Sequence, residues 1–231
     1  MQKESNLTEF DAYSDGYTNA LEDAVSFSGD DARYFADYKA DQLSSIIDPG
    51  ACAKILDYGC GVGNLSVAIH DHNPNWILHG FEISQDSLNC VPAALKSQGT
   101  FTTDLSDLDG NYDLTFLAGV MHHIVPENRL AALNSAVEHL KPGGKLVVFE
   151  HNPWNPVTRR VVDRCPFDEN AILISAPDLI ALFKSICLTQ IQRNFIVFFP
   201  KFLNFLRPLE RNLTWCPAGA QYAVIGKKPD V

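Results

Sequence analysis

One short stretch of the chain, Ile55–Leu65, restricts its fold more than any other. Its sequence, ILDYGCGVGNL, is an apolar run that ends in an acid and a tyrosine and continues into a loop with glycine at alternate positions. Glycine in such a loop permits positive φ and lets a ligand approach the backbone closely. The stretch is therefore typical of a buried strand that turns through a ligand-binding loop into a helix.

Short apolar runs alternate with amphipathic stretches along the rest of the chain. Strand-like runs occupy 54–58, 76–83, 101–103, 112–118, 145–150, 190–199 and 220–226. Helical spacing lies between them at 64–70, 85–96, 127–140 and 177–186. This alternation predicts βαβ units, and hence an α/β fold with a mostly parallel sheet.

The ends of the chain and two internal segments depart from the alternation. Residues 1–50 are polar and aromatic with helical spacing, so they are interpreted as an N-terminal helical cap on a domain at 51–231. Two insertions are predicted within that domain, at 152–175 and 200–217. Pro208 predicts that the second insertion forms two short helices, because proline interrupts a helix. A substrate lid is favoured for it over a dimer contact or a membrane-surface patch.

The residues around the glycine loop distinguish between two kinds of nucleotide cofactor. Glu82 lies 19 positions beyond Gly63 at the end of the second apolar run, where Rossmann-type folds place a carboxylate for ribose hydroxyls. Asp57 precedes the loop, and residues 55–75 hold no lysine or arginine to bind phosphate. Asn64 stands where a dinucleotide loop needs its third glycine. The loop thus favours a cationic cofactor without phosphate over NAD.

Five motifs in this order resemble class I S-adenosylmethionine-dependent methyltransferases of the small-molecule type. They are LDYGCGVGNLS, GFEIS with Glu82, TTDL with Asp104, YDLTFLAGVMHHI and LKPGGKLVVFEH. The resemblance is close from Lys54 to His151 and looser beyond. It implies a three-layer Rossmann-like sandwich, a seven-stranded mostly parallel sheet with an antiparallel last strand, and S-adenosyl-L-methionine as the cofactor.

The same resemblance implies roles for individual residues at the cofactor site. Asp57, Gly59, Cys60 and Gly61 would line the methionine end, and Glu82 would hold the ribose hydroxyls. The adenine and sulfonium contacts would come from Ile83, Asp104, Leu105, Ala118 and Gly119. Three of the acids have simpler explanations: Asp104 as the cap of a turn, Asp57 as an acid that pins the loop, and Glu82 as a surface acid.

Candidates for the acceptor side are histidines that follow the fourth and fifth strands. Strand ends face the ligand crevice in such sheets, and imidazole suits a general base at neutral pH. His151 is preferred over His123, and His122 and His123 are adjacent, so at most one of them is expected to face the site. Tyr17 is a third candidate, with Tyr13 nearby, because the N-terminal segment of similar enzymes folds over the cofactor. Arg159 and Arg160 could bind an acidic group or lie on a solvated helix face.

Charge and cysteine usage bear on the partners. The net charge of −10 predicts no nucleic-acid partner, so the expected acceptor is a small molecule, with an apolar one as an option. The six cysteines form no C-x-x-C pair, and no metal site is expected. Neither a signal peptide nor a membrane-spanning segment is evident, which predicts a cytoplasmic protein. An NAD-dependent oxidoreductase and a catalytically inactive cofactor-binding module remain alternatives.

Overall fold

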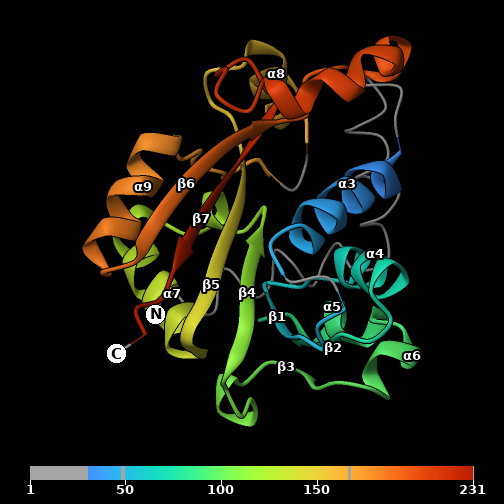
Figure 1. The fold of residues 1–231 in the computed structure, drawn as a ribbon, viewed down its shortest axis with the longest axis vertical. Coiled ribbons are helices and arrows are strands. Elements are labelled where there is room, and N and C mark those ends of the chain that lie inside the picture. Colours follow the sequence, from blue (N-terminus) through green and yellow to red (C-terminus); the bar gives the residue numbers. More distant parts are fainter. Residues whose placement is uncertain (1–30, 48–49, 166–167, 231) are drawn as a thin grey trace.

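A seven-stranded sheet organises the chain, and the computed structural model describes residues 31–47, 50–165 and 168–230 around it. The strands lie in the order β3-β2-β1-β4-β5-β7-β6 (Figure 1). Their bounds are β1 Lys54–Tyr58, β2 Ile77–Phe81, β3 Phe101–Thr102, β4 Tyr112–Ala118, β5 Leu140–His151, β6 Thr189–Ile196 and β7 Gln221–Lys227. Strands β1 to β5 pair in parallel, whereas β7 runs antiparallel to β5 and β6. The predicted fold class is confirmed.

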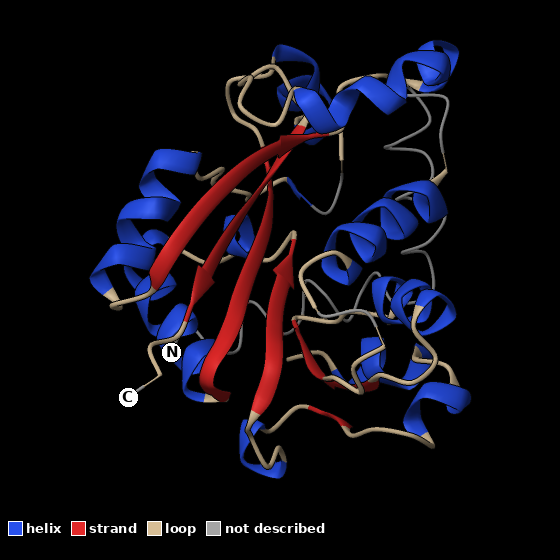
Figure 2. Cartoon of the chain, viewed as in Figure 1, coloured by secondary structure: helices blue, strands red, loops and turns tan. Residues whose placement is uncertain are grey.

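Helices cover both faces of this sheet (Figure 2). Those described are α3 Ala32–Ser44, α4 Asn64–His72, α5 Gln85–Cys90, α6 Ala93–Lys96, α7 Pro126–Glu138, α8 Pro156–Val162 and α9 Ala176–Ser185, with 3₁₀ segments η2 Leu105–Asp107, η3 Met121–His123 and η5 Lys201–Asn212. Successive strand residues point to opposite faces. In β5, Val147 and Phe149 pack in a core cluster with residues of α3 and α4, whereas Leu146 and Val148 pack with residues of α7 and α9. This alternation produces the three layers.

Two predicted helical segments, at 85–96 and 200–217, differ from the prediction in where they are interrupted, and a proline explains only the first. The helix predicted over 85–96 is two helices, because Val91 precedes Pro92 and adopts an extended conformation with ψ 130°. Segment η5 consists of two short helical parts, as predicted, but the break between them lies at Leu203, with φ −110°, and not at Pro208. Proline's fixed φ of about −65° is compatible with a helical turn, so Pro208 continues the second part of η5.

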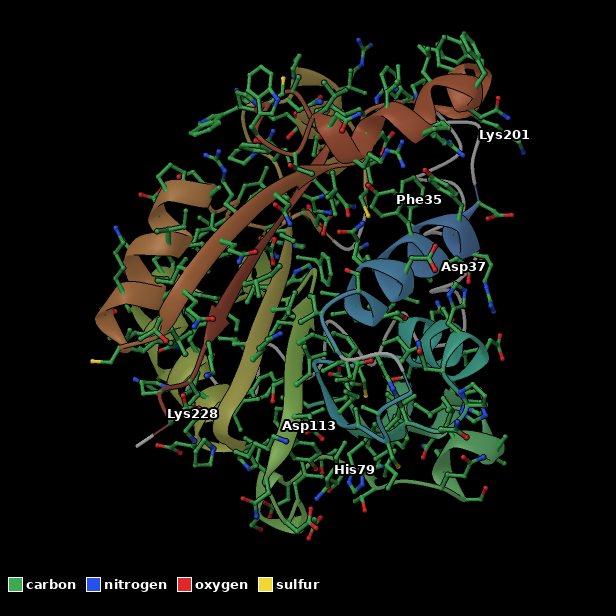
Figure 3. All side chains as sticks on the ribbon, in the orientation of Figure 1. Phe35, Asp37, His79, Asp113, Lys201 and Lys228 are labelled. Atoms are coloured by element: carbon green, nitrogen blue, oxygen red, sulfur yellow. The ribbon has the colours of Figure 1, made fainter. Side chains whose placement is uncertain are left out.

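Segment η5 passes above α3, and its exposed start carries Lys201 (Figures 1 and 3). The guanidinium of Arg207 lies 3.9 Å from the centre of the Tyr34 ring. The buried Glu210 carboxylate accepts hydrogen bonds from the Phe198 and Phe199 amides, each at 3.0 Å. Segment η5 is thus held against both α3 and the chain that leaves β6. Its role as a lid, like the division into a cap and a domain with insertions, stays a prediction.

The fold brings the carboxyl ends of β1, β2, β4 and β5 to one edge of the sheet, which is where the candidate site lies. Among the described residues, no helix combines the length and apolarity needed to cross a membrane. The cytoplasmic location stays a prediction.

Candidate functional site

The loop after β1 is tight at its first glycine and open at its second. Gly59 has φ +84°, and a Cβ there would lie 2.6 Å from a methyl group of Val120. Its amide donates to the Phe81 carbonyl at 2.7 Å, which ties the loop to β2. Gly61 also has positive φ, +52°, but a Cβ there would meet nothing within 4 Å. The loop therefore presents bare backbone toward open space at Gly61.

Two carboxylates hold this loop in place. Asp57 is buried and accepts a hydrogen bond from the Ser66 hydroxyl of α4 at 2.7 Å. Burial raises the pKa of Asp57 to about 7, and the nearby charge of Glu82 also raises it, against the effect of Ser66. The Glu82 carboxylate accepts from the Gly61 amide at 2.9 Å and from the Ser84 amide at 3.1 Å. In this structure Glu82 therefore orients the backbone of the glycine loop.

A cavity of about 500 Å³ opens beside the loop. It is within the size range of small-molecule and cofactor sites. Most of the residues predicted for the site line it: Asp57, Gly59, Cys60, Gly61, Glu82, Ile83, Ala118, Gly119, His123 and His151. Phe35 and Lys39 of α3 also line the cavity, and Figure 3 shows Phe35 below η5. Tyr13 and Tyr17 lie outside the described residues.

Asp104 and Leu105 are not among the described residues that line this cavity. Asp104 is exposed and caps η2, where its carboxylate accepts from the Ser106 amide at 2.9 Å. That hydrogen bond holds the pKa of Asp104 below its usual value. The structure thus shows the turn-capping interaction that the sequence left open, and the adenine contact of Asp104 stays a prediction.

Three histidines and two acids meet at the far side of the cavity. The Nδ1 atom of His122 lies 2.6 Å from the Glu150 carboxylate, which also accepts from the Met121 amide at 2.8 Å. The Asp168 carboxylate lies 3.3 Å from His122 Nε2 and 3.4 Å from His123 Nε2. The prediction that at most one of His122 and His123 faces the site is wrong. Both lie in the tight 3₁₀ turn η3, and both rings converge on Asp168 and line the cavity.

The three histidines have very different pKa values. Burial alone would lower the pKa of His122, but Glu150 and Asp168 outweigh it and raise the value to about 10. Burial and the charge on His122 lower the pKa of His123 and of His151 to about 4. Burial opposes the ionisation of Glu150 and Asp168, yet His122 holds the pKa of each below its usual value. His151 is thus neutral at physiological pH, and its pKa lies below the near-neutral range expected of a histidine general base.

Sequence reasoning assigned no role to three ionisable residues that line this cavity: Lys39, Glu150 and Asp168. Glu150 carries a visible signal, because it precedes the last residue of β5. Asp168 gives no such signal, since it lies in irregular chain between α8 and α9. Burial lowers the pKa of Lys39 to about 8, partly offset by Glu150.

A second hollow lies on the other side of Asp168. Arg159 and Arg164 line it, and it shares Cys165 and Asp168 with the first cavity. Arg160, the other arginine of the sequence pair, is not among the described residues that line it. Three carboxylates, those of Asp163, Asp168 and Glu169, line the same hollow, so its two guanidinium groups are accompanied by acids.

Comparison with known proteins finds similarity to methyltransferases over part of the chain. Residues 56–146 match a family model described as a methyltransferase domain. A ribosomal RNA small subunit methyltransferase C from Citrobacter koseri is 31% identical over 112 residues, which cover 45% of this chain and 33% of that protein. Its counterpart from Cronobacter sakazakii is 29% identical over 118 residues, covering 48% and 34%. The matched region spans about a third of these relatives.

Solved structures share the fold over most of the chain. A SAM-dependent methyltransferase from Archaeoglobus fulgidus has a TM-score of 0.65 at 14% identity and covers 86% of this chain and 95% of its own. Magnesium protoporphyrin IX methyltransferase from Synechocystis, with bound SAH, has a TM-score of 0.61 at 15% identity and covers 89% and 86%. At these identities the likeness concerns the fold.

One prediction about partners is contradicted by these relatives. The acidic composition predicted a small-molecule acceptor and no nucleic acid, yet the curated relatives named above are ribosomal RNA methyltransferases. Net charge sums the whole chain, whereas nucleic-acid binding depends on local charge at the contact surface. Arg159 and Arg164 lie beside this site, together with the carboxylates of Asp163, Asp168 and Glu169. Acidity alone therefore does not exclude an RNA partner.

Proposed function

We propose that this chain, whose domain belongs to the class I S-adenosylmethionine-dependent methyltransferases, transfers a methyl group to a nucleophilic atom held beside the histidine cluster. The observation that carries the proposal is the cavity that joins the glycine loop after β1 to His122, His123 and His151. Its two ends have different chemistry, one suited to a cationic nucleoside and the other to proton transfer.

The residues at the first end suit the cofactor. The open face at Gly61 leaves room for a ligand against the backbone. We assign Asp57 to the ammonium group of the methionine moiety and Glu82 to the ribose hydroxyls, with Ile83 beside the adenine and Ala118 and Gly119 beside the sulfonium. When bound, S-adenosyl-L-methionine supplies an activated methyl group on a good leaving group. The protein then has to align the acceptor, exclude water and accept a proton.

The residues at the other end would take the acceptor's proton. His151 lies at the end of β5 and its ring centre is 5.2 Å from that of His122. A neutral imidazole has a lone pair for a proton, and the low pKa of His151 keeps it neutral at physiological pH while making it a weaker base than an ordinary histidine. We assign His151 as the general base, with His123 as the second candidate. An oxygen or nitrogen nucleophile is the acceptor atom best served by such a base.

Two acceptor classes have supporting observations. A ribosomal RNA nucleotide is supported by the relatives named above, which are ribosomal RNA methyltransferases, and by Arg159 and Arg164, which share their hollow with three acids. A small-molecule acceptor is supported by the cavity itself, which such a molecule could enter without contacting the arginines of the second hollow. The test is methyl transfer from labelled S-adenosylmethionine to ribosomal RNA in parallel with a fractionated small-molecule extract. Label that enters neither acceptor, with the cofactor bound, would identify a binding module without catalysis.

Cofactor binding is predicted to depend on the open face at Gly61. The valine side chain of Gly61→Val would project into the space assigned to the methionine moiety, so its affinity for S-adenosylhomocysteine should fall at least tenfold. Calorimetry measures the affinity, and circular dichroism checks the fold. Gly110→Ala is a suitable control, because Gly110 also has positive φ, +71°, but lies away from the cavity lining. Unchanged affinity in folded Gly61→Val would contradict the cofactor assignment.

Cofactor affinity is also predicted to depend on the ionisation of Asp57. The charged carboxylate attracts the ammonium group, and the protonated acid does not. Because the pKa of Asp57 in the free protein is about 7, affinity should be full above that pH and fall as pH drops through it. A group with this pKa gives roughly a tenfold loss of S-adenosylhomocysteine affinity between pH 8 and pH 6.

The control for this pH dependence is adenosine, which lacks the ammonium group. Adenosine affinity should stay nearly constant over the same range. Asp57→Asn should flatten the pH profile of S-adenosylhomocysteine and weaken its binding at pH 8. A profile that persists in Asp57→Asn would contradict the assignment of Asp57 to the ammonium group.

A further inference from the structure

His122, His123 and Asp168 place three metal-ligating atoms around one point beside the cavity. One atom from each side chain lies within 4.8 Å of the other two. The Asp168 carboxylate oxygen is 3.3 Å from His122 Nε2 and 3.4 Å from His123 Nε2. Ligand atoms bound tetrahedrally at 2.0–2.1 Å from a zinc ion are about 3.3–3.4 Å apart. Two of the three separations thus already have the value that a bound ion would impose.

Glu150 supplies the support that a metal-binding histidine needs. Such a histidine usually gives its second ring nitrogen to a carboxylate, which fixes the orientation of the ring. The Nδ1 atom of His122 is 2.6 Å from Glu150, and the Met121 amide holds that carboxylate in turn. This contact leaves Nε2 of His122 directed toward Asp168.

The charge at this place also suits a dication. Glu150 and Asp168 bring two carboxylates into a region where His122 is 2% exposed and Glu150 is 1% exposed. Buried charges need a compensating partner, because the loss of hydration is otherwise costly. Protonated His122 offsets one of these two charges. A divalent ion that replaced that proton and bound two neutral imidazoles would balance both carboxylates at once.

We propose that His122, His123 and Asp168 bind a divalent first-row transition-metal ion, with Glu150 orienting His122. Two imidazoles and one carboxylate form a donor set used for zinc and non-haem iron(II), and three protein ligands leave a position open. Since all three residues line the cavity, the open position faces the acceptor. An acceptor hydroxyl at that position would ionise more readily, and this consequence rests on the proposed methyl transfer.

Cobalt(II) is the probe for the test, because its visible absorption reports the ligands around it. The full chain is freed of metal with a chelator and titrated with Co²⁺, with exposed Cys52, Cys90 and Cys187 changed to serine throughout. We expect one Co²⁺ per chain, visible absorption without thiolate character, and displacement by Zn²⁺. The proposal is overturned if the chain with only these three serine changes takes up no Co²⁺, or if its bound Co²⁺ has thiolate character.

Three variants locate the ion. Asp168→Asn keeps the shape of the side chain and should lower Co²⁺ affinity at least tenfold, while Glu150→Gln should lower it about 10–100-fold. His72→Ala is the matched control, because the two ring nitrogens of His72 face separate carboxylates of α3, and its Co²⁺ affinity should not change. Equal Co²⁺ affinity in wild type and Asp168→Asn overturns the proposal.

S-adenosylhomocysteine binding is measured on the same samples, so that the two proposals can fail separately. Loss of S-adenosylhomocysteine binding with Co²⁺ uptake intact counts against the proposed function only. The reverse result, cofactor binding without Co²⁺ uptake, counts against the metal site only. If Asp168→Asn does not fold, His123→Ala takes its place, with the same expected loss of Co²⁺ affinity.

Discussion

Replacing His151 with glutamine should lower methyl-transfer turnover by about 10²–10⁴-fold, the range for loss of a positioned general base. Glutamine keeps much of the length and polarity of the side chain but cannot take up a proton at physiological pH. Affinity for S-adenosylhomocysteine should stay within a factor of two or so, because the cofactor is assigned to the opposite end of the cavity. Single-turnover kinetics with the identified acceptor measure the first quantity, and calorimetry measures the second.

The control for this variant is His72→Gln, which changes a histidine on the surface of α4 next to Asp37 and Asp41. Its turnover should equal that of wild type. If His151→Gln also turns over normally, His151 is a structural residue and the acceptor needs no base from it. A parallel loss of cofactor affinity would instead indicate that the substitution disturbs the whole cavity.

The fold could be predicted from the sequence because its signals are local. The apolar run before Gly59 and the alternation of strand-like and helix-like stretches each depend on neighbouring residues. Those signals place the strand ends, and the strand ends place Asp57, Glu82 and His151 around one cavity. A local signal can also mislead about position. Pro208 was expected to divide the segment at 200–217, but the segment is divided at Leu203.

The histidine cluster depends on contacts that local signals do not carry. His122 and Glu150 are 28 positions apart, and Asp168 approaches them from irregular chain that follows α8. Their mutual effect drives the pKa of His122 up and those of His123 and His151 down, so a base with an ordinary histidine pKa is not what the structure provides. Net charge was a poor predictor of the partner for a related reason, because it sums the whole chain and does not say where the individual charges lie.

The glycine loop and the turn after β4 are joined by the contact between Gly59 and Val120. Gly119 and Val120 lead directly into η3, which carries the histidines, so this contact links the cofactor end of the cavity to the acceptor end. The backbone of Gly59 has φ +84°, and its amide is bonded to β2, so the loop cannot easily move away. Any side chain at Gly59 must displace Val120 or strain the loop.

Gly59→Ala should therefore destabilise the protein by about 2–5 kcal/mol, the sum of an alanine at positive φ and an overpacked contact. Gly110 shares the positive φ, but a Cβ there would be 3.8 Å from its nearest neighbour. Gly110→Ala should therefore lose only the stability that alanine costs at positive φ, about 1–2 kcal/mol. Urea denaturation measures both. The double variant Gly59→Ala/Val120→Ala should recover the extra stability that Gly59→Ala loses relative to Gly110→Ala. The Val120→Ala single variant completes this double-mutant cycle. Equal losses in Gly59→Ala and Gly110→Ala would show that Val120 yields without cost, and that the two ends of the cavity are not mechanically linked through this contact.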